Sequence, residues 1–175
     1  MATTPVQTTY LDNPPLPYAG LSGSCDDEAI SGFFNTDVVS IPFGFGVARD
    51  NTSPYDLLGN GAKLPTATTD KIAGIVRHSH AFSNSPNGDL DATGLKVGAM
   101  MDVLRVGRIW GICEDGCVPG DRLFIRCTAA GTGKGSLRST DPGGSTVVDC
   151  TTKAEWQTKA AALGVAMLDV DFVNK

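Results

Sequence analysis

The sequence predicts an all-β protein, either an antiparallel β-barrel or a jelly-roll-like sandwich, preceded by an extended N-terminal arm. Two observations lead to this fold class, and a third to the number of domains. Short runs alternate apolar with small or polar residues, which is typical of strands with one buried face. Turn-forming segments separate these runs, and the 175-residue chain has 21 Gly and 10 Pro. No repeated unit is found. We therefore expect an arm over residues 1–36 and a single β-domain over residues 37–175.

The arm is predicted because residues 1–36 have neither the period of a strand nor that of a helix. The stretch TYLDNPPLPYAGLSGS is rich in proline and glycine, yet it is too apolar for an ordinary solvated tail. A disordered terminus is the alternative; we favour a docking arm. Its expected contact residues are apolar or acidic: Tyr10, Leu11, Leu16, Pro17, Tyr18, Asp26, Asp27 and Glu28.

The first two strands of the domain are expected at IPFGFGVAR and within DKIAGIVRHSHAF. In IPFGFGVAR, residues 41–49, the bulky side chains fall on one face and glycine, proline and alanine on the other. Such a strand would lie with its second face against backbone. The run of apolar residues from Ile72 to Val76 is continuous, which indicates a strand buried on both faces.

Two further strands are expected at residues 101–113 and 122–126, on either side of the turn Pro119-Gly120-Asp121. The last strand is GVAMLDVDF, residues 164–172, which alternates regularly. Its apolar residues, including Leu168, are expected to face inward, and Asp169 and Asp171 outward.

One segment carries a conflicting signal. Thr152-Lys153-Ala154-Glu155 has the pattern of a helix capping box, and Gly164 stands where a helix would stop. Whether residues 152–163 form a short helix or a strand stays open at this stage.

Charge and cysteine content limit the class of partner. The first 48 residues hold five of the 19 acidic residues and none of the 14 basic ones, so the net charge of −5 lies there. An anionic segment repels phosphate, and we expect no nucleic-acid partner. The N-terminus has no basic signal region and no apolar run is long enough to span a membrane, so neither export nor a membrane partner is expected.

The five cysteines are expected to be reduced, although Cys113 and Cys117 could pair across their turn.

No motif in the chain completes a catalytic, cofactor or metal site. The loop Gly131–Ser136 resembles a phosphate-binding loop, but Gly135 follows Lys134 where Ser or Thr is needed for magnesium. His78 and His80 could share a metal ion on one strand face, yet no spacing specifies a third ligand. Glu114 and Asp115 are expected to be solvated turn residues. We expect no enzyme activity, no cofactor and no metal.

Four segments, taken in order, resemble a known family. They are PFGFGVAR, KLPTATTDKIAGIVRH, VLRVGRIWGICEDGCVPGDRLFIR and GVAMLDVDF, and together they extend from about residue 38 to residue 172. Their order and spacing are similar to those of the structural cement, or head decoration, proteins of tailed bacteriophages. The pair Cys113 and Cys117, the long loop from Asn51 to Gly61 and the helix signal at residues 155–163 depart from the family pattern.

The resemblance implies a non-enzymatic virion protein, made in the host cytoplasm, that binds the outer surface of the capsid. Its partners would be the major capsid protein and copies of itself, as a dimer or trimer, and it would cement neighbouring capsid subunits. Arg105 and Arg108 would be surface or interface residues. The alternative is a small-ligand or carbohydrate-binding β-domain of a phage tail or fibre, for which the candidate aromatic residues are Trp110, Trp156, Tyr10, Tyr18 and Tyr55.

Overall fold

A computed structural model describes residues 17–23, 28–52, 60–78 and 94–173. These residues contain strands and turns and no helix, so the all-β prediction is confirmed. It follows that none of them belongs to a helix that could cross a membrane. The strands are β1 Ala29–Asn35, β2 Gly46–Arg49, β3 Gly61–Lys63, β4 Ile72–Val76, β5 Met100–Cys113, β6 Phe124–Arg126, β7 Leu137–Arg138, β8 Val147–Asp149, β9 Ala154–Trp156 and β10 Gly164–Asp171.

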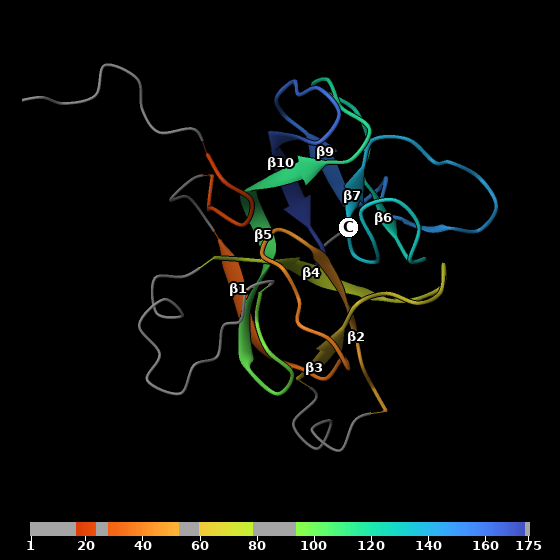
Figure 1. Cartoon of the computed structure of the whole chain (residues 1–175). Helices are drawn as coiled ribbons and strands as arrows, with labels where there is room; N and C mark the ends of the chain where they lie inside the picture. The colour runs from red at the N-terminus through yellow and green to blue at the C-terminus, as the bar shows by residue number, and fades with distance from the viewer. Residues whose placement is uncertain (1–16, 24–27, 53–59, 79–93, 174–175) are drawn as a thin grey trace, which may run out of the picture.

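The first five strands close into a barrel in the order β1-β3-β2-β4-β5, and β5 pairs again with β1 (Figure 1). The β1–β3 and β5–β7 pairs are parallel and the other strand pairs are antiparallel. The predominantly antiparallel barrel is therefore a mixed sheet. A closed barrel leaves no unpaired sheet edge among its five strands, which removes a common site of unwanted association.

Strand β5 is the longest element and belongs to two parts of the molecule. Its first half, from Met100 to Val106, pairs with β1, and its second half, from Val106 to Cys113, pairs with β10. Figure 1 shows β5 leaving the barrel towards β9 and β10. Gly107 lies at this passage with a φ of 123°, which L side chains rarely adopt, and a Cβ there would lie 3.0 Å from Cγ of Glu28. The glycine thus permits both the local backbone conformation and the close approach of the chain next to β5.

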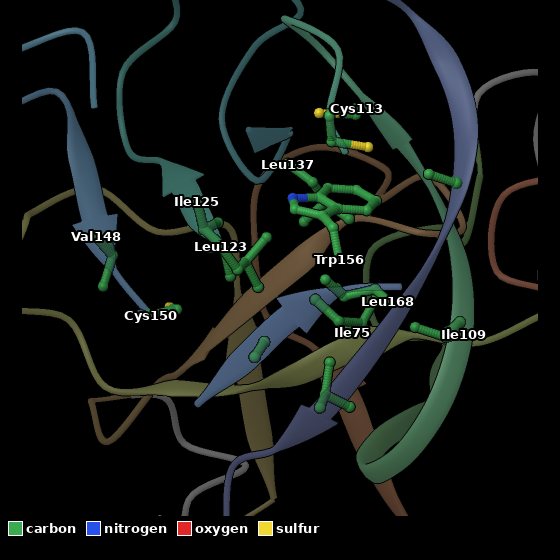
Figure 2. Packing of buried hydrophobic residues seen from close by; sticks show 14 of the residues in the cluster. Ile75, Ile109, Cys113, Leu123, Ile125, Leu137, Val148, Cys150, Trp156 and Leu168 are labelled. Atoms are coloured by element: carbon green, nitrogen blue, oxygen red, sulfur yellow. The ribbon is translucent and has the colours of Figure 1, made fainter. Parts of the chain in front are cut away.

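Two hydrophobic clusters hold these parts together. One is drawn from all five barrel strands and includes Phe33, Val47, Ala62, Ala73 and Met101. The other joins the opposite side of β4 and β5 to β6–β10 and has the indole of Trp156 near its centre (Figure 2). Burial of a large apolar side chain contributes about 1.5–3 kcal/mol to stability, so these clusters are the main source of the fold's stability.

The C-terminal strand follows its predicted pattern closely. Leu168 and Val170 are buried, and Phe172 is half-buried against the second cluster. Asp169 and Asp171 are both partly exposed. The prediction of a regularly alternating strand here is confirmed.

The open choice at residues 152–163 is decided in favour of a strand. Residues Ala154–Trp156 form β9, which pairs with β10, and Trp156 is fully buried. A helix in this segment would give up the β9–β10 hydrogen bonds and withdraw the indole from the core. Tertiary packing therefore outweighs the local capping signal.

Two boundaries of the sequence prediction are also corrected. Residues 29–35, assigned to the arm, form β1 and are part of the barrel. The strand expected over residues 41–49 is confined to residues 46–49, because Gly44 adopts a φ of 79° in a turn. Residues 29–35 form a strand because they pair with β3 and β5, which are distant in sequence. A local sequence pattern does not show such pairing.

Candidate interaction surface

Residues 17–23, here called the anchor segment, lie along the second half of β5. The amide of Gly20 donates to the carbonyl of Trp110 at 2.7 Å, the amide of Trp110 donates to Leu21 at 2.8 Å, and the amide of Gly23 donates to Arg108 at 2.7 Å. Since β10 occupies the other side of β5 at these positions, the anchor segment continues the side taken by β1. Part of the predicted arm is thus fastened to its own barrel.

Aromatic contacts hold the start of the anchor segment. The ring of His78 lies edge-on to Tyr18, with centroids 5.1 Å apart, and to Phe43 at 4.7 Å. The amide of His78 donates to the carbonyl of Gly20 at 2.8 Å. His78 is therefore part of a packing contact, whereas His80 lies outside the described residues. Tyr18 remains 44% exposed, so part of this residue is accessible to a partner.

Three of the predicted contact residues lie within the described part of the chain: Pro17, Tyr18 and Glu28. Glu28 accepts a hydrogen bond from the Ser22 hydroxyl, and its Oε2 lies 3.9 Å from Nη2 of Arg77. Its carboxylate thus faces a basic group of its own barrel. The other predicted contact residues lie outside the described residues: Tyr10, Leu11, Leu16, Asp26 and Asp27.

Exposed apolar side chains lie on two loops and on the first residue of β5, at the barrel end of that strand. We call Val38, Val39, Val97 and Met100 the barrel-end patch; Val38 is 90% exposed and Val97 56%. The buried Asn35 ties the loops together, because its Nδ2 donates to the carbonyls of Val39 at 3.1 Å and Leu95 at 2.9 Å. The carbonyl of Asn35 also accepts from the amide of Gly98 at 2.7 Å. These hydrogen bonds join the backbones of the two loops that carry the exposed apolar groups.

A second group of exposed apolar side chains lies at the other end of β5. We call Ile112, Val118 and Leu163 the extension-end patch, in which Leu163 is 61% exposed. The amide of Leu163 donates to the carbonyl of Cys113 at 2.8 Å, and the backbones of Cys117 and Ala160 exchange two hydrogen bonds of 3.0 Å. Leu163 has a φ of 60°, a left-handed conformation that is unfavourable for a residue with a branched side chain. An apolar side chain is therefore held in solvent on a strained backbone.

An ion-pair cluster is built around Glu114 and Asp115, which directly follow β5. Glu114 accepts hydrogen bonds from Nε of Arg126 at 3.0 Å and Nη2 of Arg126 at 2.8 Å, and lies 3.2 Å from Nη1 of Arg138. Asp115 accepts from Nη2 of Arg138 at 3.2 Å and from the amide of Ser139 at 2.9 Å. The expectation that Glu114 and Asp115 are solvated is wrong, because distant strands bring two arginines to them.

The same environment shifts the pKa of both carboxyl groups. Burial alone would raise the pKa of Glu114, but hydrogen bonds and charge from Arg126 and Arg138 outweigh burial and lower it. Burial would also raise the pKa of Asp115, but hydrogen bonds from Thr140 and Ser139 outweigh burial and lower it. Both groups are charged at neutral pH and bound to arginines, so they serve structure rather than acid–base chemistry.

The described cysteines are buried thiols. Cys113, Cys117, Cys127 and Cys150 are unpaired. Burial raises the pKa of each thiol, and that of Cys150 rises to about 12. A protonated and inaccessible thiol is a poor nucleophile. These four residues act as small apolar core side chains.

Backbone groups of the glycine-rich loop Gly131–Ser136 form hydrogen bonds with neighbouring strands. The amide of Gly135 donates to the carbonyl of Arg126 at 2.8 Å, and its carbonyl accepts from the amide of Gly46 at 2.8 Å.

Within the described ranges, no three His, Cys, Asp or Glu residues are placed to hold a metal ion. Trp156, a candidate for carbohydrate stacking, is fully buried.

The barrel-end and extension-end patches were not found in the sequence. Val38 and Val39 follow β1 in a loop, and Leu163 precedes β10 in a turn. Periodicity does not indicate whether a loop residue is exposed. The one sequence feature that could have indicated the barrel-end patch is the pair of adjacent valines, Val38 and Val39, directly after the acidic Asp37.

Comparison with known proteins identifies a family. The model of the structural cement protein family (E217 gp24/Pam3 gp6) matches residues 6–171. A chain in the capsid of Myoviridae phage XM1 has the same fold, with a TM-score of 0.66 and 15% identity over 97% of this chain and 100% of that chain. No curated protein sequence matches. Since the family model spans most of the chain, the protein belongs to the phage structural cement protein family, whose members are structural parts of the virion.

Proposed function

We propose that the protein binds the outer surface of the capsid and bridges neighbouring major capsid protein subunits, without enzymatic activity. The observation that carries this proposal is the pair of apolar patches at opposite ends of β5. Ile112 lies twelve positions after Met100, which at about 3.3 Å per residue amounts to about 40 Å along the strand. A rigid body with an adhesive patch at each end can contact two subunits at once.

The chemistry of the patches supports this use. Single exposed apolar residues are common, but several held together on fixed loops indicate a protein interface. Asn35 and the backbone bonds of Leu163 hold the two patches in place before binding, which lowers the entropy lost on association. Many copies on one capsid would act together, so modest contacts per copy suffice.

The N-terminal segment would add a third contact. We propose that residues 1–28 act as a docking arm, joined to the barrel by the anchor segment. Tyr10, Leu11, Leu16, Pro17 and Tyr18 would supply apolar contact and Asp26 and Asp27 negative charge, to the capsid or to an adjacent copy. Prolines restrict the free chain, so less entropy is lost when such a segment is ordered.

Co-sedimentation with capsids that lack the protein tests the proposal. The barrel-end variant Val38→Ser/Val39→Ser and the extension-end variant Leu163→Gly should each bind at least about tenfold more weakly. Leu163→Gly relieves the left-handed strain at this position, so weaker binding would not reflect lost stability. Val173→Ser is the matched control, because Val173 is 48% exposed and lies outside both patches. Undiminished binding by both patch variants would refute the bridging proposal.

A further inference from the structure

A basic cleft lies beside β5, which contributes Arg105 to its lining. Its volume is about 490 Å³, and Arg49, Lys71, Arg105 and Lys153 all line it. These residues come from separate elements: Arg49 ends β2, Lys71 precedes β4, Arg105 is on β5 and Lys153 precedes β9. The fold therefore gathers four cations that are far apart in sequence.

The cations of the cleft have no anionic partner in the described part of the chain. Arg77, Arg108, Arg126 and Arg138 each form an ion pair there, whereas none of the four cleft residues does. Nε of Arg105 is buried and has no hydrogen-bond acceptor. A buried guanidinium nitrogen without an acceptor is unfavourable, so an acceptor placed beside Arg105 would be stabilising.

The two acidic residues that also line the cleft are occupied by other groups. Asp70 accepts hydrogen bonds from the amides of Thr66 at 2.7 Å and Ala67 at 3.0 Å. Asp149 accepts from the amide of Thr151 at 2.8 Å. They close turns and form no ion pair with the four cations. The cleft consequently has an excess of two positive charges at neutral pH.

We propose that this cleft binds carboxylates of the acidic N-terminal segment of a second copy of the chain. This inference rests on the proposed cement function, in which copies lie side by side on a capsid. The argument for the occupant is charge complementarity, since residues 1–48 carry five acidic residues and no lysine or arginine. Glu28 already faces Arg77, and Asp37 accepts from the amides of Val38 and Leu64. Asp12, Asp26 and Asp27 are the acidic residues left to supply the contact.

The chemistry of the cleft suits carboxylates. The planar guanidinium of an arginine binds a carboxylate through two parallel hydrogen bonds, and flexible lysines add charge around it. Arg49 lies with its guanidinium carbon 5.9 Å from the centre of the Phe33 ring, a stacking contact that uses none of its N–H groups. The N–H groups of Arg49 are therefore available to donate to an incoming carboxylate.

Sedimentation velocity of the full chain without capsids tests the proposal over a range of concentrations. The acceptor variant is Lys71→Gln/Lys153→Gln, and the donor variant is Asp26→Asn/Asp27→Asn. Each should weaken self-association at least about tenfold, because interface charge pairs are lost. Mixing the two variants should restore part of the association, since each supplies what the other lacks. Lys134→Gln/Lys159→Gln changes the charge equally at residues outside the cleft and should have no effect.

The following results would overturn the proposal. A wild-type chain that stays monomeric, or an acceptor variant that associates like wild type, excludes the cleft as a contact between copies. Loss in the acceptor variant but not in the donor variant excludes the N-terminal segment as the occupant. Because no capsid is present, failure here leaves the capsid co-sedimentation result, and thus the cement function, to be judged separately.

Discussion

The carboxylate of Glu114 joins two guanidinium groups that come from different strands, β6 and β7. Arg126 has only 7% of its side chain exposed, so it depends on Glu114 for its charge balance. Glu114→Gln should lower the free energy of unfolding by about 3 kcal/mol, because it leaves a buried cation without its counter-ion. Urea unfolding measures this loss. Glu155→Gln, at an exposed position in β9, is the control, and an equal loss in both variants would contradict the assigned role.

Asp50 is predicted to contribute to acid sensitivity. Burial alone would raise the pKa of Asp50, but hydrogen bonds from Thr36, Thr52 and Lys63 lower it to about 2 from 3.8. A lowered folded-state pKa contributes stability that is fully present above the unfolded pKa and is lost as pH falls through the folded pKa. Wild type should thus lose about 2 kcal/mol through this group as the pH falls from 3.8 to about 2.

The Asp50→Asn variant should be less stable than wild type at pH 7, and the difference should shrink towards pH 2. Unfolding by urea at several pH values measures it. Asp141→Asn, at an exposed position, should change stability little at any pH. A constant difference between wild type and Asp50→Asn across this range would show that the carboxylate charge is not responsible.

At the scale of elements, β9 depends on Trp156. The strand has three residues, and its indole fills the centre of the second hydrophobic cluster (Figure 2). Trp156→Ala should cost about 3–5 kcal/mol of unfolding free energy, since it removes a buried side chain and leaves a cavity. Denaturant unfolding checks the value. Trp110→Ala is a matched control at a half-buried tryptophan and should cost clearly less.

The anchor segment is the element that joins the arm to the barrel. Deleting residues 1–16 should leave the melting temperature unchanged and weaken capsid binding. Deleting residues 1–24 should also lower stability by about 2–3 kcal/mol, because three backbone hydrogen bonds to β5 are lost. Thermal unfolding with capsid co-sedimentation separates the two effects. If the shorter deletion decorates capsids like the full chain, residues 1–16 make no contact.

At the scale of the whole molecule, β5 relates the fold to the proposed function. It forms one wall of the barrel, supports the anchor segment and β10, and ends at an exposed apolar patch on each side. The basic cleft also includes a β5 residue, Arg105. One continuous strand thus fixes the relative positions of every proposed contact surface in the described part of the molecule.

The sequence alone determined the β class, the C-terminal strand at residues 164–172 and the family resemblance. These depend on local alternation, turn chemistry and motif order, which a single chain displays directly. The absence of basic residues before Arg49 is equally visible in the sequence, and it predicts a segment that complements basic surfaces.

Only the tertiary structure decided the remaining features. It turned residues 29–35 and 154–156 into strands, because pairing with β5 and β10 and burial of Trp156 outweigh local propensity. It placed Glu114 between two arginines and gathered the four cations of the cleft from separate elements. The physical reason is common to all of these features: they depend on contacts between residues distant in sequence, whose free energy no local pattern contains.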